Sequence, residues 1–202
     1  MNIYSYKGDL PMLFKILTLS ALAIFYSVYL GKMIAQSRRG IQTDQLAKGN
    51  KPKRVFFTEL SAKIFAYAAI AAQIMSVLFT SSTFNIFVQC FVLILFVSAI
   101  AVFSSAVYTM HDSWRAGLPE KKTSLVTSGI YSWSRNPAFL GFDLLNIGVL
   151  LMFFNLPLMF ISLGSMISYH MQILQEEKYL TATFGEEYTQ YKHKVRRYFG
   201  HR

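Results

Sequence analysis

Four long apolar stretches divide the chain and predict its helices. They run from about Leu10 to Leu30, Leu60 to Thr80, Phe84 to Tyr108 and Ala138 to Ile173. A helix needs about 20 apolar residues to cross roughly 30 Å of hydrocarbon, so each of the first three stretches predicts one membrane-spanning helix. The fourth is much longer and is interrupted by Asn155-Leu-Pro157, so it predicts two short helices that form a hairpin. The whole pattern predicts an all-α fold with five spans.

The composition agrees with a membrane protein. The 202 residues are 53% hydrophobic and only 15% charged, whereas soluble domains carry about 25% charged residues. The single cysteine, Cys90, excludes an internal disulfide, and the four histidines form no ligand pattern, so no metal site is predicted. We expect one membrane domain over residues 1–202, with a three-span scaffold at 1–108 and a loop, the hairpin and a cytoplasmic cap at 109–202. The first span lacks a cleavage site and is expected to be a permanent anchor.

Basic residues set the expected orientation. The loop after the first span carries one acidic residue, Asp44, and many basic ones: Lys32, Arg38, Arg39, Lys48, Lys51, Lys53 and Arg54. The positive-inside rule places this loop in the cytoplasm, whereas the 81–84 and 155–157 turns carry no charge. Five spans then place the N-terminus outside, and the 109–137 loop and the C-terminal tail in the cytoplasm. The net charge of +10 sits beside the span ends, so anionic membrane lipids are the expected partners, and not nucleic acid.

Two polar segments flank the hairpin and are predicted to meet at one membrane face. The first, residues 129–137, ends in Arg135-Asn-Pro137, where Asn136 is expected to cap the fourth span and Pro137 to occupy its first turn. Arg135 and the free amides of that helix start would make a seat for a carboxylate or a phosphate. The second segment begins with Glu176 and Glu177, above the membrane surface on the end of the fifth span. That helix should stop at Gly185, and residues 186–195 should form an amphipathic helix resting on the lipid headgroups.

The order of these motifs resembles a known enzyme family. Leu-Val-x-x-Gly-Ile-Tyr from Leu125, Arg-Asn-Pro-x-Phe-Leu-Gly from Arg135, a hairpin, and Glu-Glu-x-x-Leu-x-x-x-Phe-Gly-Glu-Glu-Tyr from Glu176 are similar to the isoprenylcysteine carboxyl methyltransferase and phospholipid methyltransferase family. The resemblance covers roughly residues 110–202 and implies an integral membrane enzyme that uses S-adenosylmethionine. Asn136 stands where the family commonly has histidine, and Phe139 where it often has tyrosine.

The resemblance also implies roles for individual residues. The cofactor-binding residues that it implies are Leu125, Val126, Gly129, Tyr131, Arg135, Asn136, Pro137, Phe139, Glu176 and Glu177. Leu125 and Val126 would offer backbone groups to adenine, and Glu176 would bind the amino group of the cofactor. The rings of Tyr131, Trp114 and Trp133 could stabilise its cationic sulfur, although Trp133 is better explained as a residue of the interfacial aromatic belt.

Polar residues inside the last two spans are candidates for the acceptor side. Asp143 lies about two turns into the fourth span, where a carboxylate is costly and by default functional, and we assign it a catalytic role beside Arg135 and Glu176. The acceptor-binding candidates are Trp114, Arg115, Asp143, Asn146 and His170. For His170 a hydrogen bond between helices is an equal alternative.

We therefore expect methyl transfer from S-adenosylmethionine to a lipophilic small molecule or a lipidated acceptor, such as a lipid amine, an isoprenylcysteine carboxylate or a small thiol. Two alternatives stay open at this point. One is a membrane oxidoreductase similar to sterol reductases, although the tail pattern of those proteins is absent here. The other is a membrane scaffold or transporter without catalytic activity.

Overall fold

Helices account for all the regular secondary structure in the part of the chain that the structure describes. The computed structural model describes residues 3–81, 85–119 and 123–201. Its α-helices are α1 (Ile3–Ser37), α2 (Lys53–Phe79), α3 (Ile86–Thr109), α4 (Pro137–Met152), α5 (Leu156–Phe184) and α6 (Glu186–Lys194). Two 3-10 turns, His111–Ser113 and Gly129–Ser132, lie in the long loop before α4. The predicted all-α class is confirmed for the described ranges, while residues 82–84 of the predicted uncharged turn lie outside them.

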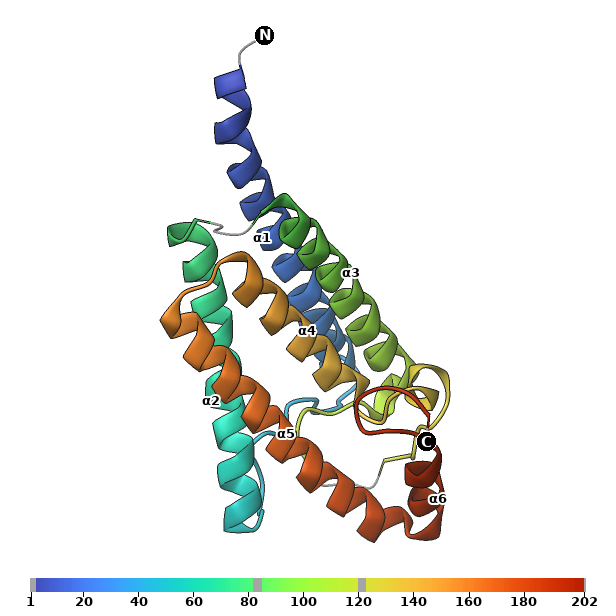
Figure 1. Cartoon of the computed structure of the whole chain (residues 1–202). Coiled ribbons are helices and arrows are strands. Elements are labelled where there is room, and N and C mark those ends of the chain that lie inside the picture. Colours follow the sequence, from blue (N-terminus) through green and yellow to red (C-terminus); the bar gives the residue numbers. More distant parts are fainter. Residues whose placement is uncertain (1–2, 82–84, 120–122, 202) are drawn as a thin grey trace.

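The hairpin breaks where the sequence predicts. The Asn155 side chain accepts a hydrogen bond from the Leu158 amide and so caps α5, and Pro157 occupies its first turn, where no amide hydrogen is needed. At the far end, Gly185 stops α5 with φ +56° and ψ −121°, a combination that residues with a Cβ rarely adopt. The two polar segments that flank the hairpin therefore return to the same end of the molecule (Figure 1).

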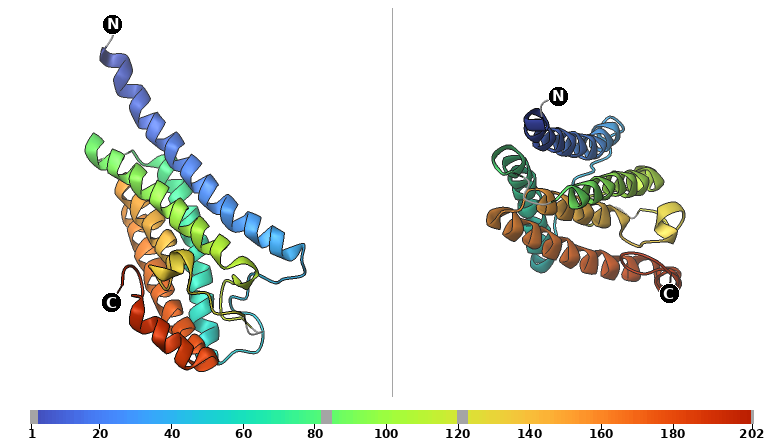
Figure 2. Two further views of the ribbon diagram at one scale, coloured as in Figure 1. Left: turned by 90° about the vertical axis from the view of Figure 1, so that its right-hand side faces the viewer. Right: turned by 45° about the horizontal axis from the view of Figure 1, so that its top comes forward.

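The helices of the hairpin pack on different neighbours. α4 packs mainly on α3, and α5 packs mainly on α2, while α1 runs beside α3 (Figures 1 and 2). Glycines allow the first of these contacts: a Cβ on Gly141 would lie 2.8 Å from Cβ of Phe103, and Gly148 faces the ring of Phe96. Small polar side chains join α2 to α5, as in the 3.0 Å hydrogen bond between Ser61 and Ser168.

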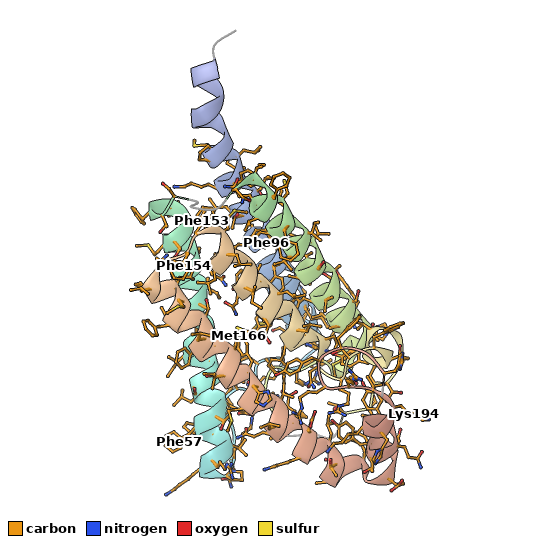
Figure 3. The ribbon with its side chains drawn as sticks, in the orientation of Figure 1. Phe57, Phe96, Phe153, Phe154, Met166 and Lys194 are labelled. Atoms are coloured by element: carbon orange, nitrogen blue, oxygen red, sulfur yellow. The ribbon has the colours of Figure 1, made fainter. Side chains whose placement is uncertain are left out.

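Large apolar side chains cover much of the outer surface. Phe96 and Phe153 are buried between the helices, whereas Phe57 is 63% exposed and points away from them (Figure 3). Phe87 on α3 is 82% exposed. A soluble monomer rarely exposes apolar surface on this scale, and a lipid environment explains it. The protein is an integral membrane protein.

Within the described ranges, three helices are long and apolar enough to cross a bilayer: α1 from Pro11, α2 and α3. α4 is also apolar but has 16 residues, which reach about 24 Å at 1.5 Å per residue. α5 is longer, with polar residues in its second half. The five-span count therefore stays a prediction.

The amphipathic helix predicted after Gly185 is confirmed as α6, but the expectation that its apolar face rests on the lipid headgroups was wrong. The apolar face of α6 carries Tyr188 and Tyr191, which are buried with Val195 against protein, and not against lipid. Leu125, from the loop before α4, belongs to the same cluster. Packing inside the protein removes these rings from water and also fixes the chain that follows α6 against the start of α4.

Candidate functional site

A cavity of about 660 Å³ opens on the loop side of the helices. Much of its apolar wall comes from α1 and α2, through Leu19, Leu22, Ala23, Tyr26, Leu30, Ala66, Tyr67, Ile70 and Ile74, and α4 and α5 add Phe139, Phe142 and Tyr169. Its charged side chains are Asp44, Lys63, Arg115, Arg135 and Glu176. An apolar chamber thus adjoins a charged end, and the first two helices, expected to be scaffold, form much of its wall.

Nine of the predicted site residues line this cavity. They are Trp114, Arg115, Leu125, Val126, Tyr131, Arg135, Asn136, Phe139 and Glu176. The structure thus brings together the loop before α4, the start of α4 and the end of α5. The other predicted residues lie outside the lining: Gly129, Pro137, Asp143, Asn146, His170 and Glu177.

Arg135 is held rigidly at the mouth of α4. Its Nη2 lies 2.7 Å from Oε1 of Glu177, and its Nη1 donates to the carbonyl oxygens of Lys192 and Val195 at 3.0 and 3.1 Å. The side chain is only 2% exposed. Its buried Nε has no hydrogen-bond partner among the described residues. An arginine at the start of α4 and a glutamate at the end of α5 therefore meet, and one buried donor is left over.

Glu177 is shared by two arginines. Arg197 donates from Nε to Oε1 and from Nη2 to Oε2, both at 2.9 Å, so Oε1 accepts from both Arg197 and Arg135. Burial alone would raise the pKa of Glu177, but the hydrogen bonds from Arg197 and Arg135 outweigh it and hold the pKa below its usual value. The sequence pattern predicted no role for Arg197, because nothing in its spacing points to Glu177. The second glutamate of the pair is thus used inside the protein.

Glu176 is the glutamate that faces the cavity. Its Oε1 accepts a 3.2 Å hydrogen bond from Gln172. Burial raises the pKa of Glu176 to about 7; the bond from Gln172 opposes this, and the charge of Glu59 adds to it. Burial and the nearby Glu176 charge also raise the pKa of Tyr131. A carboxylate that lacks a close cation in such a place is a ready partner for one.

The chain after α6 closes over the start of α4. The Asn136 side chain donates to the Arg197 carbonyl at 3.1 Å, and the Gly200 amide donates to the Trp133 carbonyl at 2.7 Å. The predicted cap at Asn136 is therefore wrong: the residue stands at the N-cap position, but its side chain makes no capping bond, because it reaches the tail instead. Trp133, which is 50% exposed, stacks on Phe199.

The polar residues deep in α4 and α5 make other contacts. Asn146 accepts a 2.9 Å hydrogen bond from Gln73, which itself accepts one from Tyr26, so this group joins three helices. His170 Nδ1 lies 2.6 Å from the hydroxyl of Tyr198, a contact with the tail. Asp143 has a buried Oδ1 with no hydrogen-bond partner among the described residues.

A buried carboxylate that the sequence analysis missed fixes two cavity loops. Glu59 on α2 is fully buried and accepts from Lys51 at 2.7 Å and from the amides of Ala47 and Leu118, both at 2.8 Å. Gly117 approaches so closely that its Cβ would lie 3.1 Å from Oε1 of Glu59. One side chain therefore holds the loop after α1 and the loop after α3 together along the cavity. A single glutamate near the start of a span gave no signal of this.

Comparison with known proteins bears on the same residues. Residues 91–182 match the model of the isoprenylcysteine carboxyl methyltransferase (ICMT) family, and this range includes the loop, α4 and most of α5. This match covers slightly less than half of the chain. The matched segment thus contains Arg135, Glu176 and Glu177, while α6 and Arg197 lie beyond it.

Curated relatives carry the same family name. The chain is similar to protein-S-isoprenylcysteine O-methyltransferases of Saccharomyces cerevisiae, with 38% identity over 96 residues, and of Xenopus laevis, with 41% identity over 73 residues. These matches cover 45% and 36% of this chain, but only 39% and 25% of the relatives. The match to the Schizosaccharomyces pombe protein, at 36% identity, covers 35% of this chain and 30% of that relative. The chain therefore matches less than half the length of these ICMT relatives.

Proposed function

We propose that the protein is a membrane methyltransferase that binds S-adenosylmethionine at the charged end of the cavity and a lipophilic acceptor in its apolar chamber. The observation that carries this proposal is the meeting of Arg135, at the start of α4, with the glutamate pair at the end of α5, 2.7 Å from Arg135 to Glu177. The ICMT match across this segment supports it.

The residues present fit the proposed cofactor. Glu176 faces the cavity without a close cation and would bind an ammonium group, while the unpartnered Nε of Arg135 and the start of α4 would bind a carboxylate. Trp114 and Tyr131 offer aromatic faces to a cationic group. The backbone of Leu125 and Val126 lines the same wall and would bind adenine. When bound, S-adenosylmethionine would supply an electrophilic methyl group on a positively charged sulfur.

The protein's own part in this reaction would be positioning. Direct displacement at a methyl carbon needs the two reactants held in line, and no covalent link to the protein. Glu177 holds Arg135 in place from one side and Arg197 holds Glu177 from the other, so the charged end is rigid before any ligand binds. A water-poor chamber would protect the reaction from hydrolysis.

We propose an isoprenylcysteine carboxylate, the group in the relatives' name, as the acceptor. The apolar walls of α1 and α2 suit a prenyl chain, which would enter sideways from the bilayer. A carboxylate needs no base to accept a methyl group. The location of Asp143 outside the cavity lining favours this acceptor over an amine or a thiol, both of which would need a base.

The proposed topology has five spans, with α4 and α5 crossing as a hairpin, and places the cavity mouth in the cytoplasm. The basic loop between α1 and α2 supports this orientation. The protein would then lie in the cytoplasmic membrane with its N-terminus outside.

Calorimetry with S-adenosylhomocysteine in detergent tests cofactor binding. We expect binding to the intact protein and at least tenfold weaker binding to Glu176→Gln, with Glu187→Gln, an exposed glutamate of α6, as the matched control. Absence of binding to the intact protein, or equal binding by both variants, would overturn the proposal. A melting temperature raised by a nicotinamide cofactor would favour the reductase alternative. A melting temperature that neither cofactor raises would favour the scaffold without catalytic activity.

The acceptor has a separate test. Labelled S-adenosylmethionine is incubated with the protein and a farnesylated cysteine peptide, or with a native lipid extract. A base-labile methyl ester on the peptide would support the carboxylate acceptor, and label that enters only the lipid extract would replace it.

A further inference from the structure

We infer that a groove between the loop-side ends of α1 and α3 binds the phosphate headgroup of an anionic phospholipid. The groove has a volume of about 330 Å³ and shares no lining residue with the large cavity. It is lined by α1 from Ser27 to Ala35, by Arg39 just after α1, and by the last turn of α3 with the residues that follow it.

Positive charge in this groove exceeds negative charge. Lys32 and Arg39 line it from the α1 side, and His111 and Asp112 from the α3 side. Arg39 donates from Nη1 to both carboxylate oxygens of Asp112, at 3.0 and 3.1 Å. Lys32 is half-buried and makes no hydrogen bond or ion pair among the described residues. One carboxylate thus faces two permanent cations, and the surplus charge suits a phosphate.

The shape of the groove leaves room for a ligand. A Cβ added to Gly31 would meet no atom within 4 Å, so the floor is open there. Val28 and Val107 give apolar sides, and Tyr108, 65% exposed, stands at the rim.

The position of the groove identifies the source of the phosphate as a lipid. Ile24 lies one turn before Val28 on the same face of α1 and is 51% exposed, so an apolar surface continues from the groove along the helix. An acyl chain could follow that surface while its headgroup stays beside Lys32. A free phosphate or a nucleic acid has no acyl chain to cover this apolar surface. Basic pockets between helices at a membrane surface are typical headgroup sites.

The experiment is a titration of the detergent-purified protein with short-chain phosphatidylglycerol or phosphatidylcholine, followed by native mass spectrometry. Each basic side chain near a membrane surface is worth roughly fivefold in affinity, so Lys32→Gln/Arg39→Gln should bind phosphatidylglycerol roughly twentyfold more weakly. Arg38→Gln/Lys53→Gln removes the same charge from neighbouring positions outside the groove and should change binding less than about twofold. Asp112→Asn removes the acceptor that competes for Arg39 and should strengthen binding.

Three outcomes would overturn the inference. Equal losses in the two double variants would mean diffuse attraction to the basic surface. Equal binding of the two lipids by the intact protein would mean that charge is not recognised. If Lys32→Gln/Arg39→Gln fails to fold, the Asp112→Asn variant still tests the inference. Unchanged or weaker binding of phosphatidylglycerol by Asp112→Asn would contradict a phosphate beside Arg39.

Discussion

Two adjacent glutamates have opposite environments in this protein. Glu177 is paired with Arg135 and Arg197, whereas Glu176 faces the cavity and, among the described residues, accepts its side-chain hydrogen bond from the neutral Gln172 and forms no ion pair. Neighbouring residues on a helix point about 100° apart, so one can pack inward while the next faces a ligand. This division explains why one carboxylate has a lowered pKa and the other a raised one.

Removal of the Glu177 charge should cost stability. In Glu177→Gln, the buried Arg135 guanidinium keeps its charge but loses its anion, and breaking a buried pair typically costs about 3–5 kcal/mol. We expect a clearly lower melting temperature by circular dichroism in detergent. Glu187→Gln should melt like the parent protein, and equal melting of all three proteins would contradict the rigid role of Glu177.

The same ion pairs predict an acid-side loss of stability. Because the pKa of folded Glu177 lies below its unfolded value, the stabilisation is complete above the unfolded pKa and is lost as pH falls through the folded one. Melting temperatures measured down to pH 3 should therefore fall more steeply for the parent protein than for Glu177→Gln. If the melting temperatures of the two proteins fell in parallel, carboxylates other than Glu177 would account for the loss of stability in acid.

Cofactor affinity should depend on the protonation of Glu176. Its pKa is raised to about 7, so a protonated side chain below that pH cannot pair with an ammonium. We expect the affinity for S-adenosylhomocysteine to rise by up to about tenfold per pH unit between pH 5.5 and 7 and then to level off. Calorimetry should find a nearly flat profile for Glu176→Gln, and a sloping one would assign the titration to another group.

At the level of single residues, the sequence predicted that Arg135 lies close to the glutamate pair, but not which glutamate it binds. The motif order was enough to place Arg135 beside the glutamate pair, which the structure shows at 2.7 Å. The choice of Glu177 over Glu176, and the part of Arg197, depend on helix rotation and on the path of the tail. Neither of these can be predicted from the spacing of residues along the sequence.

At the level of elements, close packing of α3 on α4 depends on glycine. A methyl group on Gly141 would lie 2.8 Å from Cβ of Phe103 and 3.1 Å from the Ala99 carbonyl oxygen, so the backbone of α3 would have to move. This contact helps to position the start of α4, and Arg135 lies two residues before that helix.

Gly141→Ala should therefore destabilise the protein by about 1–3 kcal/mol, the usual cost of overpacking. Gly31→Ala is the control, since a Cβ there meets nothing within 4 Å and alanine favours the helix. Thermal unfolding in detergent compares the two. Equal melting temperatures would show that α3 and α4 can separate without cost.

Helix ends were predictable, whereas helix partners were not. Asn155, Pro157 and Gly185 are local signals, and the helices break at these positions as expected. The pairing of α2 with α5 and the burial of the tyrosines of α6 are tertiary choices. In a helix that faces lipid, apolar residues cover every side, so hydrophobic periodicity does not show which side faces protein.

For the whole molecule, the loops before α2 and α4 and the tail lie at one end, and the end of α2 and the start of α3 lie at the other (Figures 1 and 2). The proposed topology makes this measurable by cysteine labelling in a Cys90→Ser background. In sealed inside-out vesicles, a membrane-impermeant maleimide should label Lys53→Cys and Lys194→Cys but not Ser81→Cys. If Ser81→Cys and Lys53→Cys were both labelled, the two positions would lie on the same side of the membrane, which would contradict a single crossing by α2.

Dependence of Arg135 on residues far along the chain has a consequence for biosynthesis. Its anion follows 42 residues later, and the tail carbonyls that bind its Nη1 follow 57 and 60 residues later. A growing polypeptide that has inserted α4 but has not yet completed α5 carries this arginine without its anion, and until α6 is made the arginine also lacks its carbonyl partners. The ribosome would then have to translate past α6 before the contacts of Arg135 could all form, and a product that ends before α6 would be an early target for quality-control proteases.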